Sequence, residues 1–154
     1  MREAHGSTAF KGKVGVLSLG GEVAMLREIR QAIGEDAVLR VDTNNMWSLT
    51  TAREAVRRFA PFNIRNYEDP VDTYEELARL RPYTDASFCT HNPDLRRAAL
   101  MPVPDYFCLN LSELGGIRRT VEFIKAAHTF GRGAWFHSGE SSIGTAAYLH
   151  VAAA

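Results

Sequence analysis

Short apolar runs alternate along the chain with stretches of helical periodicity. Each run has the length of a buried strand, and each leads through a polar segment into an amphipathic one. The runs cover residues 14–17, 38–41, 64–67, 86–89, 106–109 and 133–136. This order predicts consecutive βα units, in which parallel strands are joined by right-handed crossovers.

Local signals support the predicted helices. The apolar positions 23, 26, 29 and 33 share one helical face, and Gly34 follows where a left-handed residue would end the helix. Thr51 and Thr73 each precede a glutamate by three residues, a spacing typical of a capping box. Positions 117, 121, 124 and 128 form a further stripe that is predicted to face the core.

Polar side chains cluster at the predicted carboxyl ends of the strands. They are Asp42, Asn44, Glu68, Asp69, Thr90, His91, Asn92, Asn110, His137 and Ser138. In a β/α barrel all such ends meet on one rim, whereas in a doubly wound sheet only those near the switch point converge. The glycine-rich GxGxxG motif is absent after the first strand, which disfavours a dinucleotide-binding sheet. The sequence therefore predicts an α/β fold, a partial TIM-type (β/α) barrel of about six consecutive βα units.

Composition narrows the range of partners. The 154 residues carry 18 Lys+Arg and 18 Asp+Glu, with a pI near 7.0, so no basic surface for nucleic acid is expected. The start of the chain lacks the apolar region of a secretory signal, and no apolar stretch approaches the ~20 residues of a membrane span. We expect a cytoplasmic protein without membrane contacts. Cys89 and Cys108 lack CxxC spacing and are expected to be buried, reduced thiols.

Two carboxylates, Asp42 and Glu68, end neighbouring predicted strands and supply the oxygen ligands that Mg²⁺ prefers. The alternative is structural: Asp42 caps a turn and Glu68 pairs with an arginine. A third ligand could come from the next strand end, where His91 suits Mn²⁺, Fe²⁺ or Zn²⁺ and Asn92 suits Mg²⁺ better.

Candidate acid–base groups lie near both ends of the chain. Lys11 and Lys13 are two residues apart, so on a strand they share a face, and an ammonium beside another cation is a candidate base. Alternatively, both are solvent-exposed lysines at an irregular edge near the N-terminus. His137 ends an apolar run and is a candidate general base oriented by Asn110, or else a rim histidine without a chemical role.

Four motifs taken in order resemble the enolase superfamily. The resemblance is greatest to its mandelate racemase and muconate lactonizing group, and within that group to glucarate dehydratase-like acid-sugar dehydratases. The motifs are Phe10-Lys11-Gly12-Lys13, the segment from Val41 to Ser48, Tyr67-Glu68-Asp69-Pro70 and Phe136-His137-Ser138.

The resemblance implies specific roles for these residues. Lys13 is expected to be the base on one face of the substrate and His137 the acid/base on the other, with Asn110 beside it. The implied metal ligands are Asp42, Glu68 and, by register, His91, holding Mg²⁺, or Mn²⁺ if the imidazole binds. The positions expected to contact the substrate are Lys11, Asn44, Thr90 and Ser138. Asn110 stands where the family usually has an aspartate, so it could hold the His137 ring without adding a charge that stabilises an imidazolium.

The implied activity is a metal-dependent hydro-lyase reaction on a sugar acid, passing through an enediolate. A racemase or epimerase of the same superfamily is the alternative. Residues 1–9 are expected to form a lead-in tail and residues 10–154 part of a catalytic barrel without the family's N-terminal capping domain. A barrel of ~250 residues cannot close from six units, so an inactive fragment or an interaction module is a further reading. The family also implies a homo-oligomer with a small-molecule substrate.

Overall fold

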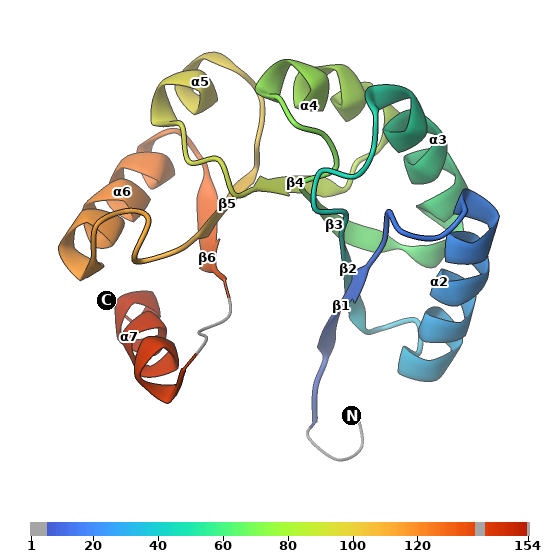
Figure 1. The fold of residues 1–154 in the computed structure, drawn as a ribbon, viewed down its shortest axis with the longest axis horizontal. Coiled ribbons are helices and arrows are strands. Elements are labelled where there is room, and N and C mark those ends of the chain that lie inside the picture. Colours follow the sequence, from blue (N-terminus) through green and yellow to red (C-terminus); the bar gives the residue numbers. More distant parts are fainter. Residues whose placement is uncertain (1–5, 138–140, 154) are drawn as a thin grey trace. The chain divides into compact units, whose positions relative to one another are not determined.

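A computed structural model describes residues 6–137 and 141–153 of the chain. The chain divides into two compact units, residues 1–88 and 89–154, each of which is described by itself. Strands alternate with helices in both units (Figure 1). Among the described residues, no helix is both long enough and apolar enough to cross a bilayer.

The first unit carries a parallel sheet in the order β1-β2-β3. Its elements are β1 (Ala9–Lys13), α2 (Leu19–Ile33), β2 (Val38–Asp42), α3 (Leu49–Phe59), η1 (Ala60–Phe62), β3 (Ile64–Glu68), α4 (Tyr74–Leu80) and η2 (Arg81–Tyr83). Strand β4 (Ser87–Thr90) begins in this unit and ends in the second. The register pairs Lys13 with Asp42 and Asp42 with Glu68, so the last residues of all three strands lie in one row.

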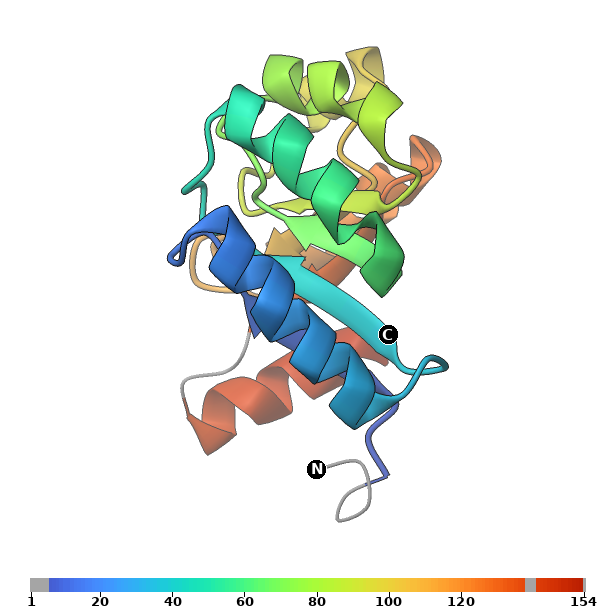
Figure 2. The same cartoon turned by 90° about the vertical axis from the view of Figure 1, so that its right-hand side faces the viewer.

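Helices of the first unit pack on one face of its sheet. Leu39 and Val41 on β2 are fully buried, while the residues between them and after them in the strand point the other way. Trp47 packs edge-on against Phe59 of α3, with 5.8 Å between the ring centres. Figure 2 shows α2 and α3 side by side over the strands. The opposite face of β1–β3 is thereby left to polar side chains.

The first strand lies earlier than the apolar run predicts. The expected strand over residues 14–17 is wrong, because β1 covers Ala9–Lys13 and the chain then turns at Gly15, which has φ +98°. A Cβ at Gly15 would lie 2.9 Å from Cβ of Met46. Val16 and Leu17 are 81% and 55% exposed, so their apolar character does not mark a buried strand here.

Helix ends agree in part with the sequence signals. Gly34 caps α2 with φ +77°, and Thr73 caps α4 by accepting a hydrogen bond from the backbone N–H of Glu76 at 3.2 Å, both as predicted. The capping role predicted for Thr51 is wrong. Ser48 caps α3 instead, and its hydroxyl accepts from the N–H of Thr51 at 3.2 Å. Ser48, Thr50 and Thr51 all carry hydroxyl groups, so the sequence alone does not show which of them caps the helix.

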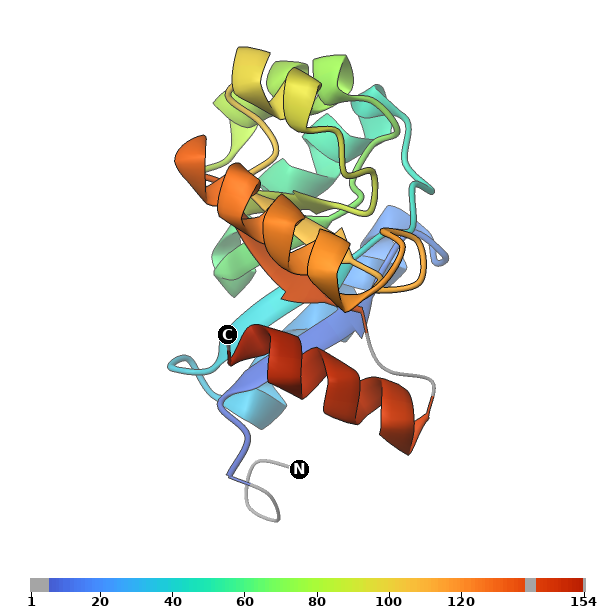
Figure 3. The same cartoon turned by 90° about the vertical axis from the view of Figure 1, so that its left-hand side faces the viewer.

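The second unit continues the same alternation. It contains the end of β4, then α5 (Leu95–Leu100), β5 (Tyr106–Leu109), α6 (Ile117–Thr129), β6 (Gly133–Phe136) and α7 (Ser142–Ala152). β5 pairs in parallel with both β4 and β6. Figure 3 shows α6 lying along β6 and α7 following it. The parallel pairs in both units confirm the prediction of consecutive βα units.

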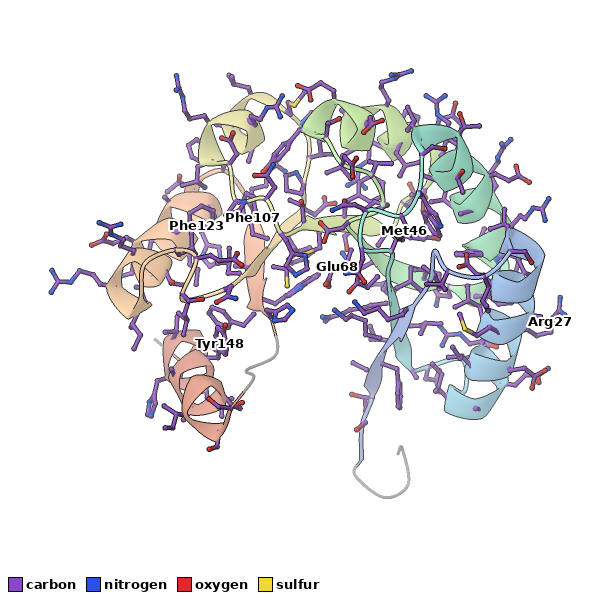
Figure 4. All side chains as sticks on the ribbon, in the orientation of Figure 1. Arg27, Met46, Glu68, Phe107, Phe123 and Tyr148 are labelled. Carbon is purple, nitrogen blue, oxygen red and sulfur yellow. The ribbon has the colours of Figure 1, made fainter. Side chains whose placement is uncertain are left out.

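Helix α6 buries a face that matches the predicted one only in part, since Val121 and Ile124 of the predicted stripe are half-buried. Thr120 and Ala127 are fully buried, whereas Ile117 is 53% exposed and His128 is exposed. The Thr120 hydroxyl donates to the Gly116 carbonyl at 3.0 Å, so this hydroxyl has a hydrogen-bond partner although it is buried. A pattern based on apolar residues alone would place a threonine on the solvent side of the helix. On the same side of α6, Phe123 packs against Phe107 of β5 with ring centres 5.1 Å apart (Figure 4).

Candidate active site and metal ligands

The ends of β1, β2 and β3 present the ionisable residues of the first unit. Since side chains alternate along a strand, Lys11 and Lys13 lie on one face of β1. The register places Asp42 and Glu68 beside Lys13 on the same row. Figure 4 shows Glu68 on the side of the strands that the helices leave uncovered.

Ion pairs join these four residues. Nζ of Lys13 lies 2.5 Å from Oδ2 of Asp42, and Nζ of Lys11 lies 3.2 Å from the same oxygen and 2.8 Å from Oε1 of Glu68. The Asp42 and Glu68 side chains are 1% and 2% exposed, whereas those of Lys11 and Lys13 are 42% and 60% exposed. The carboxylates are thus buried charges balanced by lysines that reach them from the solvent side. Glu68 thus pairs with Lys11, and not with an arginine as the structural alternative assumed.

Electrostatics favour the charged forms of Asp42 and Lys11. Burial raises the pKa of the Asp42 carboxyl, but the hydrogen bonds from Lys13 and the Asn44 N–H, with the charge of Lys11, outweigh it and hold that pKa below its usual value. Burial lowers the pKa of Lys11, while its hydrogen bond to Glu68 and the charges of Glu68 and Asp42 raise it overall. As long as no metal ion binds these carboxylates, the Lys11 side chain therefore stays protonated.

Asn44 ties the cluster to the loop after β2. Its Oδ1 accepts from Nζ of Lys13 at 2.7 Å, and its backbone N–H donates to Oδ1 of Asp42 at 3.0 Å. Asn44 and Asn45 have φ of +48° and +57°, and asparagine is one of the few residues with a side chain that adopts this region readily. The Asn-Asn pair was visible in the sequence, and its left-handed turn is what brings the amide back to Lys13.

Glu22 of α2 is a residue that the sequence analysis missed. Its side chain is buried, and Oε1 accepts hydrogen bonds from the backbone N–H groups of Gly15 and Val16, the latter at 3.0 Å. These donors belong to the turn directly after Lys13. A glutamate in the first turn of a helix is common, because its charge interacts favourably with the helix dipole. The sequence therefore does not single out Glu22, and only the fold shows that it holds the turn after Lys13.

Thr43 and Asp69 hold the next two loops together. The Thr43 hydroxyl donates to the Asp69 carbonyl, and the backbone N–H of Thr43 donates to the Glu68 carbonyl at 3.1 Å. Asp69 has φ +45°, so the chain bends sharply just after the carboxylate of Glu68. The predicted polar position Asp69 thus acts through its backbone in this structure.

The residues of the first unit fit a hard divalent cation in part. Asp42 and Glu68 are adjacent in register and deeply buried, and carboxylate oxygens are the ligands that Mg²⁺ takes while it keeps several waters. Their present counter-charges are lysine ammonium groups, which can withdraw to solvent because both side chains are substantially exposed. Two ligands of the expected set are therefore assembled within one unit.

The third predicted metal ligand and its neighbours lie in the second unit. Thr90 ends β4 and is 7% exposed, and its hydroxyl accepts from the N–H of Asn92 at 3.2 Å. His91 is half-buried and directly follows the strand. His91 or Asn92 as a metal ligand, and Thr90 as a substrate contact, stay predictions.

Asn110 and His137 follow β5 and β6 in the second unit. Oδ1 of Asn110 accepts from the N–H and hydroxyl of Ser112 at 3.0 and 2.7 Å and from the hydroxyl of Tyr148 at 3.2 Å. The backbone N–H of His137 donates to the Leu109 carbonyl at 3.0 Å, and its side chain is exposed. The ring-orienting role of Asn110 stays a prediction. Ser138 lies outside the described residues.

Comparisons with known proteins cover most or all of the chain. Residues 1–154 match a family model described as "Enolase C-terminal domain-like". A D-Ala-D/L-Ala epimerase from Cytophaga hutchinsonii is 33% identical over 113 residues, covering 69% of this chain and 31% of the relative. A chloromuconate cycloisomerase from Pseudomonas putida is 29% identical over 98% of this chain and 43% of the relative. An arabinonate dehydratase from Saccharolobus solfataricus is 28% identical over 97% of this chain and 42% of the relative.

A solved structure extends the comparison to the fold. An enolase from Pseudomonas fluorescens Pf0-1, crystallised with magnesium, potassium and tartrate, is 30% identical, with a TM-score of 0.88 over 99% of this chain and 37% of the other. The likeness confirms the predicted partial (β/α) barrel as the fold class. The chain spans between 31% and 43% of the length of the three curated relatives described above.

Proposed function

Because the chain belongs to the enolase C-terminal domain-like family, we propose that its strand-end residues catalyse abstraction of the proton next to the carboxylate of a polyhydroxy acid, followed by loss of the β-hydroxyl as water. The reaction class is thus a hydro-lyase acting on acid sugars. The observation that carries the proposal is the row of Lys13, Asp42 and Glu68 across three parallel strands, with both carboxylates buried and ion-paired with lysines.

Lys13 is the proposed base in the first unit. Its ammonium nitrogen stands at the rim, 60% of the side chain is exposed, and Oδ1 of Asn44 holds Nζ at 2.7 Å. A substrate carbon acid can therefore approach Nζ from the solvent side while the asparagine keeps that atom in place. Proton removal breaks the α-carbon–hydrogen bond and leaves the electron pair on an enediolate, and Lys13 must be in its neutral form to receive the proton.

His137 is the proposed second acid–base group. Loss of the β-hydroxyl breaks a carbon–oxygen bond, and an imidazolium that gives its proton to this oxygen lets water leave in place of hydroxide. The enol that results becomes a 2-keto-3-deoxy acid by taking a proton at carbon 3. Asn110 in place of a carboxylate would leave the imidazolium without charge stabilisation, so we propose a lower activity at this position than an aspartate would support.

Asp42 and Glu68 are the residues proposed to hold Mg²⁺, with Mn²⁺ as the substitute if His91 completes the set. When bound, the divalent cation supplies positive charge beside the substrate carboxylate, where the reaction builds up negative charge. Nζ of Lys11 lies 2.8 Å from Oε1 of Glu68 and 3.2 Å from Oδ2 of Asp42, so its ammonium group stands beside the proposed position of the cation. We therefore propose that Lys11 binds the substrate carboxylate and transfers no proton.

The substrate class rests on two relatives. One similar protein is an arabinonate dehydratase, and one similar structure holds magnesium together with tartrate, a dicarboxylate with two adjacent hydroxyl groups. Both support a hydroxylated carboxylic acid for this chain. A carboxylate with a β-hydroxyl is also what proton abstraction and water loss require.

An epimerase is the second candidate function. The D-Ala-D/L-Ala epimerase, at 33% identity, favours it, since epimerisation uses the same α-proton abstraction and returns the proton on the opposite face. The two reactions differ in their products: an epimerase exchanges the α-proton and retains every oxygen, whereas a dehydratase also yields a keto acid.

The test is α-proton exchange by the chain in D₂O. Incubation with Mg²⁺ and a panel of aldonic and aldaric acids is expected to give deuterium at carbon 2, read by proton NMR, together with a 2-keto-3-deoxy acid. Lys13→Ala is expected to abolish both signals, and Lys125→Ala, at an exposed lysine of α6, is the matched control. Exchange without a keto acid would establish the epimerase, and absence of exchange with every acid would overturn both candidates.

Hydrodynamic size separates the enzyme from the non-catalytic alternative. A catalytic chain is expected to sediment as one defined species that binds Mg²⁺. Large or heterogeneous assemblies without ion binding would instead support an inactive fragment or an interaction module.

A further inference from the structure

Two loops that follow β1 and β2 carry large apolar side chains into solvent. Val16 and Leu17 lie in the loop that begins directly after Lys13, and they are 81% and 55% exposed. Met46 lies two residues after Asn44, in the loop after β2, and is 63% exposed. Figure 2 shows both loops at the same end of the strands. Single exposed apolar residues are ordinary, whereas a group of them beside polar side chains is typical of a binding surface.

The two loops pack against each other. A Cβ at Gly15 would lie 2.9 Å from Cβ of Met46, so the backbone of the first loop rests directly on the second. The N–H of Val14 donates to the Asp42 carbonyl at 2.9 Å, which ties the first loop to the end of β2. Val16, the residue after Gly15, is therefore held close to Met46.

The exposure of the first loop is part of the fold. The buried carboxylate of Glu22 accepts hydrogen bonds from the backbone N–H groups of Gly15 and Val16, the latter at 3.0 Å. A Cβ at Gly21 would lie 3.5 Å from Cβ of Leu17, so Leu17 lies against the first turn of α2. Because the backbone is fixed at successive residues, the fold itself holds these apolar side chains in water.

Positive charge borders the same surface. The Lys13 side chain is 60% exposed, and Oδ1 of Asn44 holds its Nζ at 2.7 Å. Since Met46 follows Asn44 by two residues, one loop brings an ammonium group and an exposed thioether side chain to the same rim. A small molecule that is anionic at one end and apolar at the other complements both features.

We propose that Val16 and Met46 bind the hydrocarbon end of the substrate, which is a deoxy acid sugar: a 2,3-dihydroxy acid whose carbons beyond carbon 3 carry hydrogen in place of hydroxyl. This inference rests on the proposed function, which uses only the carboxylate, the α-proton and the β-hydroxyl. A hydroxyl group against the two side chains would lose its hydrogen bonds to water without replacement. A methylene group that is buried there gains about fourfold in affinity.

Binding of a homologous series of acids tests the surface. Calorimetry with Mg²⁺ present compares 2,3-dihydroxypropanoate, -butanoate, -pentanoate and -hexanoate with the aldonic acids of five and six carbons. The Kd is expected to fall roughly two- to fourfold with each added carbon, and the longer deoxy acids to bind at least ~10-fold more tightly than the aldonic acids of equal length. Equal affinity across the series, or no binding by any of these acids, would overturn the proposal.

Two substitutions of similar size remove the apolar character of the surface. Met46→Gln and Val16→Thr are expected to flatten the dependence of Kd on chain length and to leave the Kd of 2,3-dihydroxypropanoate unchanged. Leu100→Gln, at a leucine of α5 that is 86% exposed, is the matched control and should keep the dependence of the parent. A dependence that survives both substitutions in the two loops would refute the assignment.

A second measurement uses the parent chain with ¹³C-labelled methionine methyl groups. The NMR signal of Met46, assigned by its loss in Met46→Gln, is expected to shift with 2,3-dihydroxyhexanoate and to stay in place with 2,3-dihydroxypropanoate. The signal of Met25 in α2 should not move with either acid. A shift of the Met46 signal with chain concentration alone would indicate a second copy of the chain as the occupant and overturn the proposal.

Neither readout requires turnover, so the two proposals can fail separately. Binding that depends on the hydrocarbon end, without α-proton exchange, would refute the proposed reaction and support this surface. Exchange with aldonic acids, without any preference for the deoxy acids, would do the reverse.

Discussion

Lys13 and Asp42 are register partners at the ends of β1 and β2, and Nζ of the lysine lies 2.5 Å from Oδ2 of the carboxylate. The carboxylate is buried while the lysine side chain is 60% exposed. The same carboxylate oxygen is therefore the proposed metal ligand and the present partner of the proposed base. A bound Mg²⁺ ion and the Lys13 ammonium group are therefore expected to compete for Oδ2 of Asp42.

Lys13→Met is expected to tighten Mg²⁺ binding, because it removes a positive charge next to the ligand oxygen. For an exposed lysine the gain should be about fivefold in Kd, or roughly 1 kcal/mol. Isothermal titration with Mg²⁺ measures it. Asp42→Asn is expected to weaken binding strongly, whereas Asp36→Asn, at an exposed aspartate before β2, should leave it unchanged. Weaker binding by Lys13→Met would contradict the competition.

Glu22→Ala is expected to loosen the turn that follows Lys13. The Gly15 and Val16 N–H groups lose their acceptor, and each unsatisfied donor costs about 1–3 kcal/mol locally. Amide hydrogen exchange should speed up about tenfold at these two positions. Glu22→Gln keeps an acceptor oxygen and should restore much of the protection, and Glu28→Ala, at an exposed glutamate of α2, should change nothing. Unchanged exchange in Glu22→Ala would rule out this role.

Arg30→Ala is expected to lower the free energy of unfolding by about 3 kcal/mol. Its buried guanidinium donates to the Phe62 carbonyl at 3.1 and 2.8 Å and to the Ala37 carbonyl at 2.8 Å, joining the end of α2 to η1 and to the start of β2. Removing it leaves buried carbonyl groups without a donor. Urea unfolding measures the loss.

Arg27→Ala is the matched control for Arg30, since Arg27 points away from the strands on the same helix (Figure 4). It should stay within about 0.5 kcal/mol of the parent. Equal effects of the two substitutions would show that the carbonyl contacts of Arg30 contribute little.

Tyr67→Phe is expected to reduce the loss of stability at alkaline pH. Burial raises the pKa of the Tyr67 phenol above its ordinary value of 10.0. Above pH 10 the unfolded phenol ionises while the folded one keeps its proton, so the stabilisation present below pH 10 is lost as the pH rises. One proton corresponds to about 1.4 kcal/mol per pH unit. Urea unfolding at pH 8 and 11 should show a smaller drop for Tyr67→Phe, and equal drops would contradict it.

Several residues could be predicted from sequence because their signal is local. Asp42 and Glu68 each follow an apolar run by one position, and parallel strands carry such residues to one edge of the sheet. Gly34 and Thr73 mark helix ends through backbone geometry that neighbours in the chain decide. β1 was misplaced because Val16 and Leu17 look like a strand by composition, while the turn at Gly15 depends on contact with Met46.

The alternation of apolar runs and helical periods by itself determined the βα order and the strand-end position of Asp42 and Glu68. Periodicity and spacing are properties of neighbouring residues, so one chain suffices to read them. Only the tertiary structure decided that Lys11 and Lys13 share the oxygen of Asp42, that Glu22 holds the loop after Lys13, and that Gly15 packs against Met46. Those relationships depend on strand register and on side-chain reach across elements, and neither is encoded in local spacing.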